Sequence, residues 1–227
     1  MGYNLRMKKI LITFFFFVLG IIGAYFLIIF PNNREPAKII SFLPEKISPT
    51  QTAFSLENAP DKTLKATIST VSGEILWQSR TATEPSILLT KDLAVQQGEK
   101  LIASKSGTLT LNFDLAGELS LFPDTEIELV QTLPVNLVFN QTKGTAEYES
   151  RANTFAVLVN RLLLNFLKAN VKVSIDNTKG IITVKVNQGE VIAAYNNQNF
   201  VSQRVELQEN EGFIFDNEKR QGEKTSF

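Results

Sequence analysis

The stretch Gly98–Leu133, GEKLIASKSGTLTLNFDLAGELSLFPDTEIELVQTL, decides the fold of this chain. Apolar and polar residues alternate in three short runs, separated by turn residues at Ala116-Gly117 and again at Phe122-Pro123-Asp124. Alternation with a period of two is typical of strands with one buried face, and each run has about the usual six residues of a strand. The stretch predicts a meander of three strands.

The same pattern extends to both sides of this stretch. Alternation over 64–69, a turn at Ser72-Gly73-Glu74 and the apolar run 75–77 predict a hairpin. Towards the C-terminus, turn signals recur roughly every 8 to 12 residues, as in a sandwich, barrel or β-solenoid. We therefore predict one all-β domain over 61–220, built of stacked β-hairpins in a sandwich or solenoid-like arrangement, with 221–227 as a disordered tail.

One segment departs from clean alternation. Residues 155–167, FAVLVNRLLLNFL, are so densely apolar that they fit either a helical stripe or a strand covered on both faces. Length and context favour one long, doubly covered strand with a bend, followed by a turn at Ala169-Asn170. Arg161 within it is expected to meet a carboxylate or carbonyl group, or to mark a face open to solvent.

The N-terminal part has a different character. Residues 10–30 contain no charged side chain and follow Arg6, Lys8 and Lys9. A helix of this length spans roughly 30 Å, the hydrocarbon thickness of a bilayer. A removed signal peptide is the alternative, but its apolar core is usually shorter and ends at a small-residue cleavage site. We predict an uncleaved transmembrane helix over 10–30.

Basic residues are denser before this helix than after it, which predicts a cytoplasmic tail over 1–9 and an extracytoplasmic C-terminal part. Residues 31–60 contain five of the eight prolines and predict a semi-rigid stalk. Three of the 23 basic residues precede the helix, so the outer part has 20 basic against 23 acidic groups, a net charge of −3. This balance does not favour nucleic-acid binding.

The chain contains neither histidine nor cysteine. Disulfides, the usual zinc ligands, the Ser-His-Asp triad and Cys-His nucleophile pairs are therefore excluded. No D-x-D-x-D-G calcium loop occurs. The sequence predicts no metal, no cofactor and no catalytic residue. Paired carboxylates at Asp124, Glu126 and Glu128 could serve glycoside chemistry, but their spacing is also that of a solvent-facing strand.

Several motifs carry a resemblance to a known family. Gly98-Glu99-Lys100-Leu101-Ile102, Ser106–Leu111, Gly117–Leu121 and Pro123–Ile127 resemble the successive strand and turn elements of the FecR-like domain, as do later elements at 143–148, 188–191 and 205–209. The resemblance covers about 120 residues and implies an extracytoplasmic all-β fold in a bacterial cytoplasmic membrane protein. Signalling members carry a cytoplasmic sigma-factor-binding region, which nine residues cannot form, so the transcriptional role is not implied.

The function that we expect is a membrane-anchored, extracytoplasmic binding or sensing module that contacts another cell-envelope protein through strand edges or turns. The candidate contact residues are Trp77, Tyr195, Asn196, Asn197 and Asn199, beside the turn 176–179. The plainer interpretation of the turns is that they are solvated loops without a partner. The plainer interpretation of Trp77 is that it packs in the core or at a strand edge. The alternative function is carbohydrate or cell-wall attachment, with Trp77, Tyr148, Tyr195 and Phe200 as stacking residues.

Overall fold

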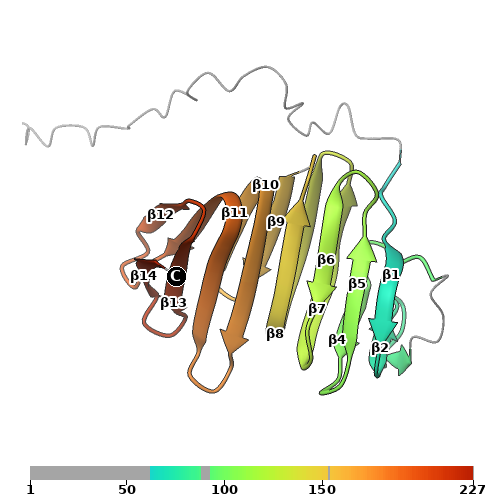
Figure 1. Cartoon of the computed structure of the whole chain (residues 1–227). Coiled ribbons are helices and arrows are strands. Elements are labelled where there is room, and N and C mark those ends of the chain that lie inside the picture. Colours follow the sequence, from blue (N-terminus) through green and yellow to red (C-terminus); the bar gives the residue numbers. More distant parts are fainter. Residues whose placement is uncertain (1–61, 88–92, 153, 227) are drawn as a thin grey trace, which may run out of the picture. The chain divides into compact units, whose positions relative to one another are not determined.

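The structure is a computed structural model that describes residues 62–87, 93–152 and 154–226, and these residues form fourteen β-strands (Figure 1). Among the described residues, none belongs to a helix of the length and apolarity needed to cross a bilayer. The predicted transmembrane helix over 10–30 and the stalk over 31–60 lie outside this part of the chain. The all-β prediction for the domain is confirmed.

The strands form one sheet that folds over on itself into two facing layers without closing (Figure 1). The first layer contains β1 (Thr67–Ser72), β5 (Thr108–Asn112), β6 (Gly117–Leu121), β13 (Glu211–Asp216) and β14 (Gln221–Ser226). The second layer contains β2 (Ile75–Gln78), β3 (Ser86–Ile87), β4 (Lys100–Ala103), β7 (Thr125–Leu133), β9 (Thr154–Val159) and β12 (Ser202–Leu207). Three long strands, β8 (Asn136–Ser150), β10 (Leu162–Asp176) and β11 (Ile181–Asn196), belong to both layers.

The long strands bend from one layer into the other. β8 pairs with β7 up to Lys143 and with β6 from Ala146 onward, so it changes layer near Gly144. The pairing of β10 with β11 shifts register between Leu167 and Val171, where both strands bend. Such irregularities allow a strand to turn a corner while its ladder continues on either side. The two layers are thus joined through backbone as well as through side chains.

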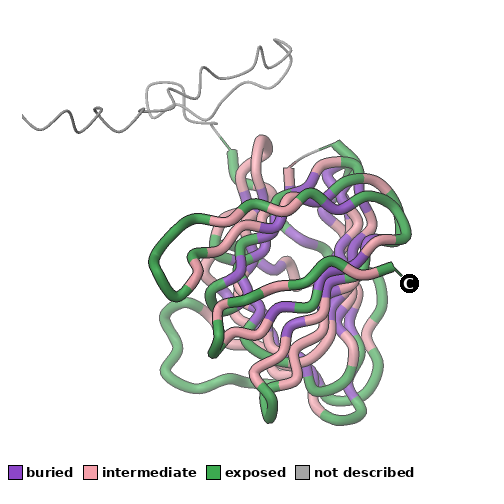
Figure 2. The backbone as a smooth tube through the Cα atoms, turned by 90° about the vertical axis from the view of Figure 1, so that its left-hand side faces the viewer, coloured by how far each residue is buried: buried purple, intermediate pink, exposed green. Residues whose placement is uncertain are grey.

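The core fills the space between the layers. Inward-facing residues of almost every strand are buried, outward-facing residues are mostly intermediate, and the turns are mostly exposed (Figure 2). Its centre is a cluster of aromatic rings, Phe113, Phe139, Tyr148, Phe155 and Phe166, with neighbouring ring centroids 5.3 to 6.4 Å apart. Rings from both layers meet in this cluster, so it holds the layers against each other.

A buried polar group lies beside this cluster. The hydroxyl of Tyr148 donates to Oε1 of Gln141 at 3.1 Å, and Nε2 of Gln141 donates to the carbonyls of Gly144 and Val173 at 3.0 and 3.3 Å. Burial raises the pKa of Tyr148 well above its ordinary value, so the phenol is a neutral donor. Gln141, held by Tyr148, thus binds the backbone where β8 changes layer and joins it to β10.

We predict that Tyr148→Phe destabilises the domain by about 1 to 2 kcal/mol, because it leaves the buried Oε1 of Gln141 without its donor. Tyr195→Phe is the matched control, since the hydroxyl of half-buried Tyr195 donates no hydrogen bond within the described residues; we expect less than about 0.5 kcal/mol there. Urea unfolding followed by circular dichroism measures both changes. Equal effects of the two substitutions would contradict a structural role for the Gln141 contact.

Two predicted connections differ in the structure. The turn 72–74 does not form a hairpin: β1 pairs with β5, whereas β2 pairs with β3 and β4, so the chain crosses from the first layer to the second. The predicted meander is confirmed for β5 and β6, which pair directly. Its third strand, β7, pairs with β4 and β8 instead of β6, because the turn 122–124 is a second crossing between the layers.

Two further predictions are corrected. Residues 155–167 are neither one doubly covered strand nor a helix but the hairpin of β9 and β10, with its turn at Asn160-Arg161. β10 continues through Ala169-Asn170, so the turn that we expected there is a bend. The C-terminal residues 221–226 are not a disordered tail, because they form β14 in continuous register with β13.

Candidate functional site

The structure places the five candidate contact residues in two separate regions. Trp77 lies in β2, at the opposite end of the sheet from the end of β11, with Tyr195 and Asn196, and the turn after it, with Asn197 and Asn199 (Figure 1). Its indole N–H donates to Oε2 of Glu99 at 3.1 Å, and the same oxygen accepts from the backbone N–H of Gln96 at 2.8 Å. Trp77 also packs against the core. It therefore does not join the other candidates in a site.

The side chains of Asn196, at the end of β11, and Asn197, in the turn that follows, are hydrogen-bonded locally. Oδ1 of Asn197 accepts from the backbone N–H groups of Asn199 and Val201 at 2.9 and 3.0 Å. Oδ1 of Asn196 accepts from the hydroxyl of Ser202 at 2.8 Å. The two bonds to Asn197 satisfy backbone N–H groups that a tight turn leaves unpaired, whereas the bond to Asn196 joins two side chains across the ends of β11 and β12. The turn is thereby held rigid, and it projects Phe200, whose side chain is 78% exposed.

Tyr195 closes the core at this end of the sandwich. Its ring lies 4.8 Å from that of Phe215 and 6.0 Å from that of Phe213. The two phenylalanines are fully buried, whereas Tyr195 is only half-buried. Of these three rings, Tyr195 is therefore the one that reaches the surface.

An open hollow of about 550 Å³ lies over this end of the domain. Both layers contribute to it, the second through β11 and β12 and the first through β13, β14 and their connecting turn. Its lining residues are Tyr195, Asn197, Gln203, Ile214, Asp216, Lys219, Arg220, Gln221, Gly222 and Glu223. Only Tyr195 and Asn197 belong to the candidates predicted from the sequence.

Apart from Gln203 in β12, the remaining lining residues lie in the β13–β14 hairpin and were missed because β14 has no usable sequence signal. QGEKTS (221–226) has no apolar residue, so its alternation cannot be seen, although the preceding polar run 217–220 is a possible turn. At Gly222 a β-carbon would lie 1.9 Å from Cζ of Phe213, which shows how closely β14 covers that ring. β14 is recognisable as a strand only through this packing.

The carboxylate of Asp216 is the centre of the hydrogen bonds and the ion pair in the β13–β14 turn. It accepts from the backbone N–H groups of Glu218 and Lys219 at 3.0 and 2.9 Å and pairs with Nζ of Lys219 at 3.0 Å. The backbone hydrogen bond from Lys219 is the main reason that the pKa of Asp216 lies below its ordinary value. The carboxylate is therefore ionised and already occupied at neutral pH.

We predict that Asp216→Asn lowers stability at neutral pH and that its deficit shrinks in acid. Because the folded-state pKa of Asp216 is depressed, its contribution is present above the unfolded pKa and is lost as the pH falls through the folded one. Thermal unfolding of both proteins between neutral and strongly acidic pH measures the difference. A difference in stability between the two proteins that stays constant over this pH range would contradict the stabilising role of the ionised Asp216 carboxylate.

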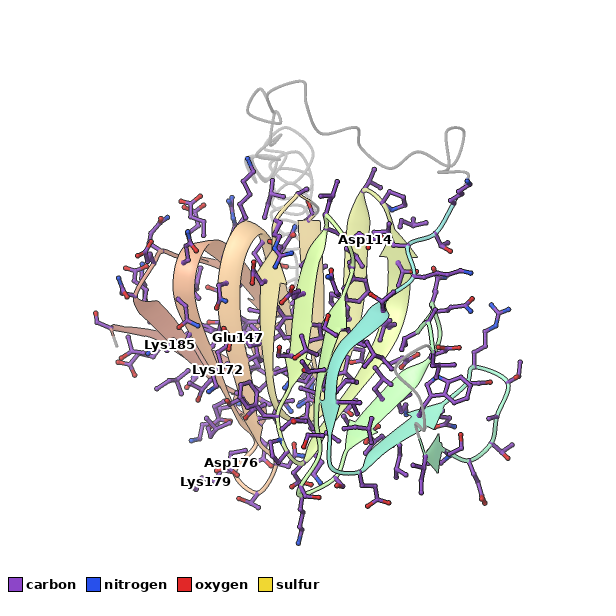
Figure 3. The ribbon with its side chains drawn as sticks, turned by 45° about the vertical axis from the view of Figure 1, so that its right-hand side comes forward. Asp114, Glu147, Lys172, Asp176, Lys179 and Lys185 are labelled. Carbon is purple, nitrogen blue, oxygen red and sulfur yellow. The ribbon has the colours of Figure 1, made fainter. Side chains whose placement is uncertain are left out.

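The β10–β11 turn has the same design and lies next to the β13–β14 turn. The carboxylate of Asp176 accepts from the hydroxyl of Thr178 at 2.6 Å, the main cause that lowers its pKa, and pairs with Lys179 (Figure 3). The two turns are connected, because the N–H of Asn217 donates to the carbonyl of Gly180 at 2.9 Å. Exposed Arg161, from the β9–β10 turn, donates to the carbonyl of Asn217 at 2.9 Å, a carbonyl partner as expected.

Two further groups of charged side chains lie elsewhere on the surface. Glu147, Lys172 and Lys185 lie side by side on the polar outer face of the first layer (Figure 3). Asp124 and Glu126, considered for glycoside chemistry, pair with Lys143 and Lys100 respectively. Within residues 62–87, 93–152 and 154–226, no three acidic side chains are grouped so that they could hold a metal ion.

Comparisons with known proteins add little to this geometry. No protein-family model and no curated protein matches the sequence. Two crystal structures, at 1.65 and 2.50 Å resolution, of a "putative anti-sigma factor" from Parabacteroides distasonis ATCC 8503 are similar, each with 14% identity and a TM-score of 0.49. Each match covers 56% of this chain and 59% of the other. This is a loose relation and carries no functional argument.

Proposed function

We propose that this chain is a membrane-anchored, extracytoplasmic binding module of the bacterial cytoplasmic membrane, and that the C-terminal end of its sandwich contacts another cell-envelope protein. The observation that carries the proposal is the hollow flanked by two edge strands, β12 and β14, one from each layer. An exposed strand edge offers backbone donors and acceptors in a row, and the hollow offers side-chain contacts beside them. The single-pass, N-in anchor over 10–30 is part of the proposal.

We also propose that the module is non-catalytic. Asp216 is held by two backbone N–H groups and a lysine, and Glu211, at the other end of β13, pairs with Lys224 at 2.6 Å. The hydrogen bond from Lys224 is the main cause that lowers the pKa of Glu211. A general acid needs a raised pKa near the working pH, so both carboxylates have the opposite bias. This end of the domain favours recognition over proton transfer.

Site-specific photo-crosslinking in the source cells tests the proposal. A benzophenone amino acid at Gln203, in the hollow, is compared with the same residue at Ser120, on the outer face of the first layer. We expect one discrete protein adduct from position 203 and none from position 120. Adducts from both positions, or from neither in a folded protein, would contradict a specific protein-binding end.

The alternative function is carbohydrate or cell-wall attachment. It is favoured by one observation: Tyr195 lies in the same hollow as Asn197 and Gln203, which combines an aromatic ring with amides that can bind hydroxyl groups. Tyr148 is fully buried and Trp77 is remote, so neither belongs to such a site. Co-sedimentation with purified wall polysaccharide, abolished by Gln203→Ala and retained in Ser120→Ala, would favour this alternative over a protein partner.

A further inference from the structure

Four strands end the two layers within the described residues, and three of them are poor templates for another strand. β3 has only two residues, and β1 contains a register shift between Ile68 and Thr70. On β12, Arg204 and Glu206 form an exposed ion pair at 2.7 Å, and the carbonyl of Glu206 already accepts from Nζ of Lys224 at 3.1 Å. Shortness, bulges and edge charges are the usual means of blocking an edge.

β14 is neither that short nor irregular, although it does carry charged residues. All six of its residues, Gln221–Ser226, pair with β13 without a register shift. Its one basic residue, Lys224, is directed to Glu211 and to the carbonyl of Glu206, towards the second layer. The edge of β14 is therefore a regular row of backbone groups, and its basic side chain, although partly exposed, is already paired.

The charge that remains on β14 is acidic. Glu223 is exposed and has no ion-pair partner among the described residues. It lies directly opposite Ile214, whose side chain is 41% exposed, so a carboxylate and an apolar side chain are neighbours on the outer face. An added strand would place one of its own side chains beside Glu223, where opposite charges stabilise and like charges destabilise a cross-strand pair.

We propose that β14 is the strand to which a partner protein adds an extended segment, with a basic side chain beside Glu223 and an apolar one near Ile214. This inference rests on the proposed function and names the mode of contact. A second copy of this chain fits less well, because antiparallel pairing centred on Glu223 would set two carboxylates against each other. Backbone hydrogen bonds along β14 would supply affinity, and Glu223 would supply the choice of partner.

A charge-swap experiment on the full chain tests the inference. The probes are two soluble peptides, acetyl-Ser-Thr-Val-Lys-Val-Thr-Ser-amide and the same peptide with Glu in place of Lys. We expect the wild-type protein to bind the lysine peptide about fivefold more tightly at low salt, and Glu223→Lys to reverse this preference. Glu218→Lys is the control, because it makes the same charge change in the β13–β14 turn, away from the edge, and should leave the preference unchanged.

Hydrogen exchange locates the binding. The lysine peptide should slow exchange of alternate amides along 221–226 and leave β12 unaffected. Equal binding of both peptides, protection elsewhere, or no binding would overturn the inference, as would a concentration-dependent dimer with protected β14 amides. If the wild type gives the adduct from position 203 but the lysine peptide does not protect amides of 221–226, the proposed protein contact stands and strand addition fails; if no adduct forms in the wild type, the proposed function itself fails.

Discussion

Phe139→Ala is expected to lower the free energy of unfolding by about 3 to 5 kcal/mol, the usual range for removing a buried phenylalanine ring. Phe139 is fully buried at the centre of the aromatic cluster, with its ring centroid 5.3 Å from that of Phe155, 5.5 Å from Tyr148 and 5.6 Å from Phe113. Its neighbours belong to both layers, so the cavity would not close by moving one strand. Urea unfolding of the full chain, followed by circular dichroism, measures the loss.

Leu158→Ala is the matched control. Leu158 lies on β9 of the same layer, but its side chain points outward and is 40% exposed. Truncation there removes little buried surface, and we expect a loss below about 1 kcal/mol. If Phe139→Ala cost no more than Leu158→Ala, the aromatic cluster would not be what holds the layers together.

The positions of the strands can be predicted from the sequence far better than which strands pair with each other. Alternation at 108–112, 117–121 and 171–175 depends on which face of a strand is buried, and this is a local property. A turn such as Ser72-Gly73-Glu74 looks the same whether the next strand returns beside the last one or crosses to the other layer. That choice depends on packing between residues far apart in the chain, which turn chemistry does not encode.

The dense stretch 155–167 was misread for a related reason. Phe155, Val157 and Val159 face the core, as alternation requires. Leu158 and Leu163 are apolar as well, although they lie directly opposite each other on the outer face and are 40% and 43% exposed. With both faces apolar, the period of two disappears from the sequence. The remaining sequence sign of a turn is then Asn160, because asparagine tolerates a positive φ; in the structure its φ is 54°.

The candidate site was predictable only in part. Tyr195 is predicted as an aromatic residue that can stack on a ligand and Asn197 as part of a polar turn, and both line the hollow. The opposite wall comes from β13 and β14, which no local pattern connects with that turn. Trp77 was chosen as the single tryptophan of the chain, and residue type alone did not reveal that Glu99 occupies its indole N–H.

Gly144→Ala is expected to destabilise the domain by about 3 to 5 kcal/mol, because strain and overpacking act together there. Gly144 has a φ of 79° at the point where β8 changes layer. A β-carbon at this position would lie 2.2 Å from the carbonyl oxygen of Asp124 and 2.5 Å from Oγ1 of Thr125. That oxygen of Thr125 exchanges hydrogen bonds with the backbone of Thr145 at 2.8 and 2.9 Å, so the corner cannot move aside without losing them.

Gly180→Ala is the control that separates backbone strain from overpacking. Gly180 has a similar φ of 65°, but the nearest atom to a β-carbon there is Cγ of Glu218 at 3.5 Å, an ordinary contact with a flexible side chain. Only the conformational cost applies, so we expect a loss of about 1 to 2 kcal/mol. Urea unfolding of the two variants side by side measures the difference. Equal losses would mean that the corner at Gly144 yields easily, and that the layers are joined by side-chain packing and not by the bent backbone of β8.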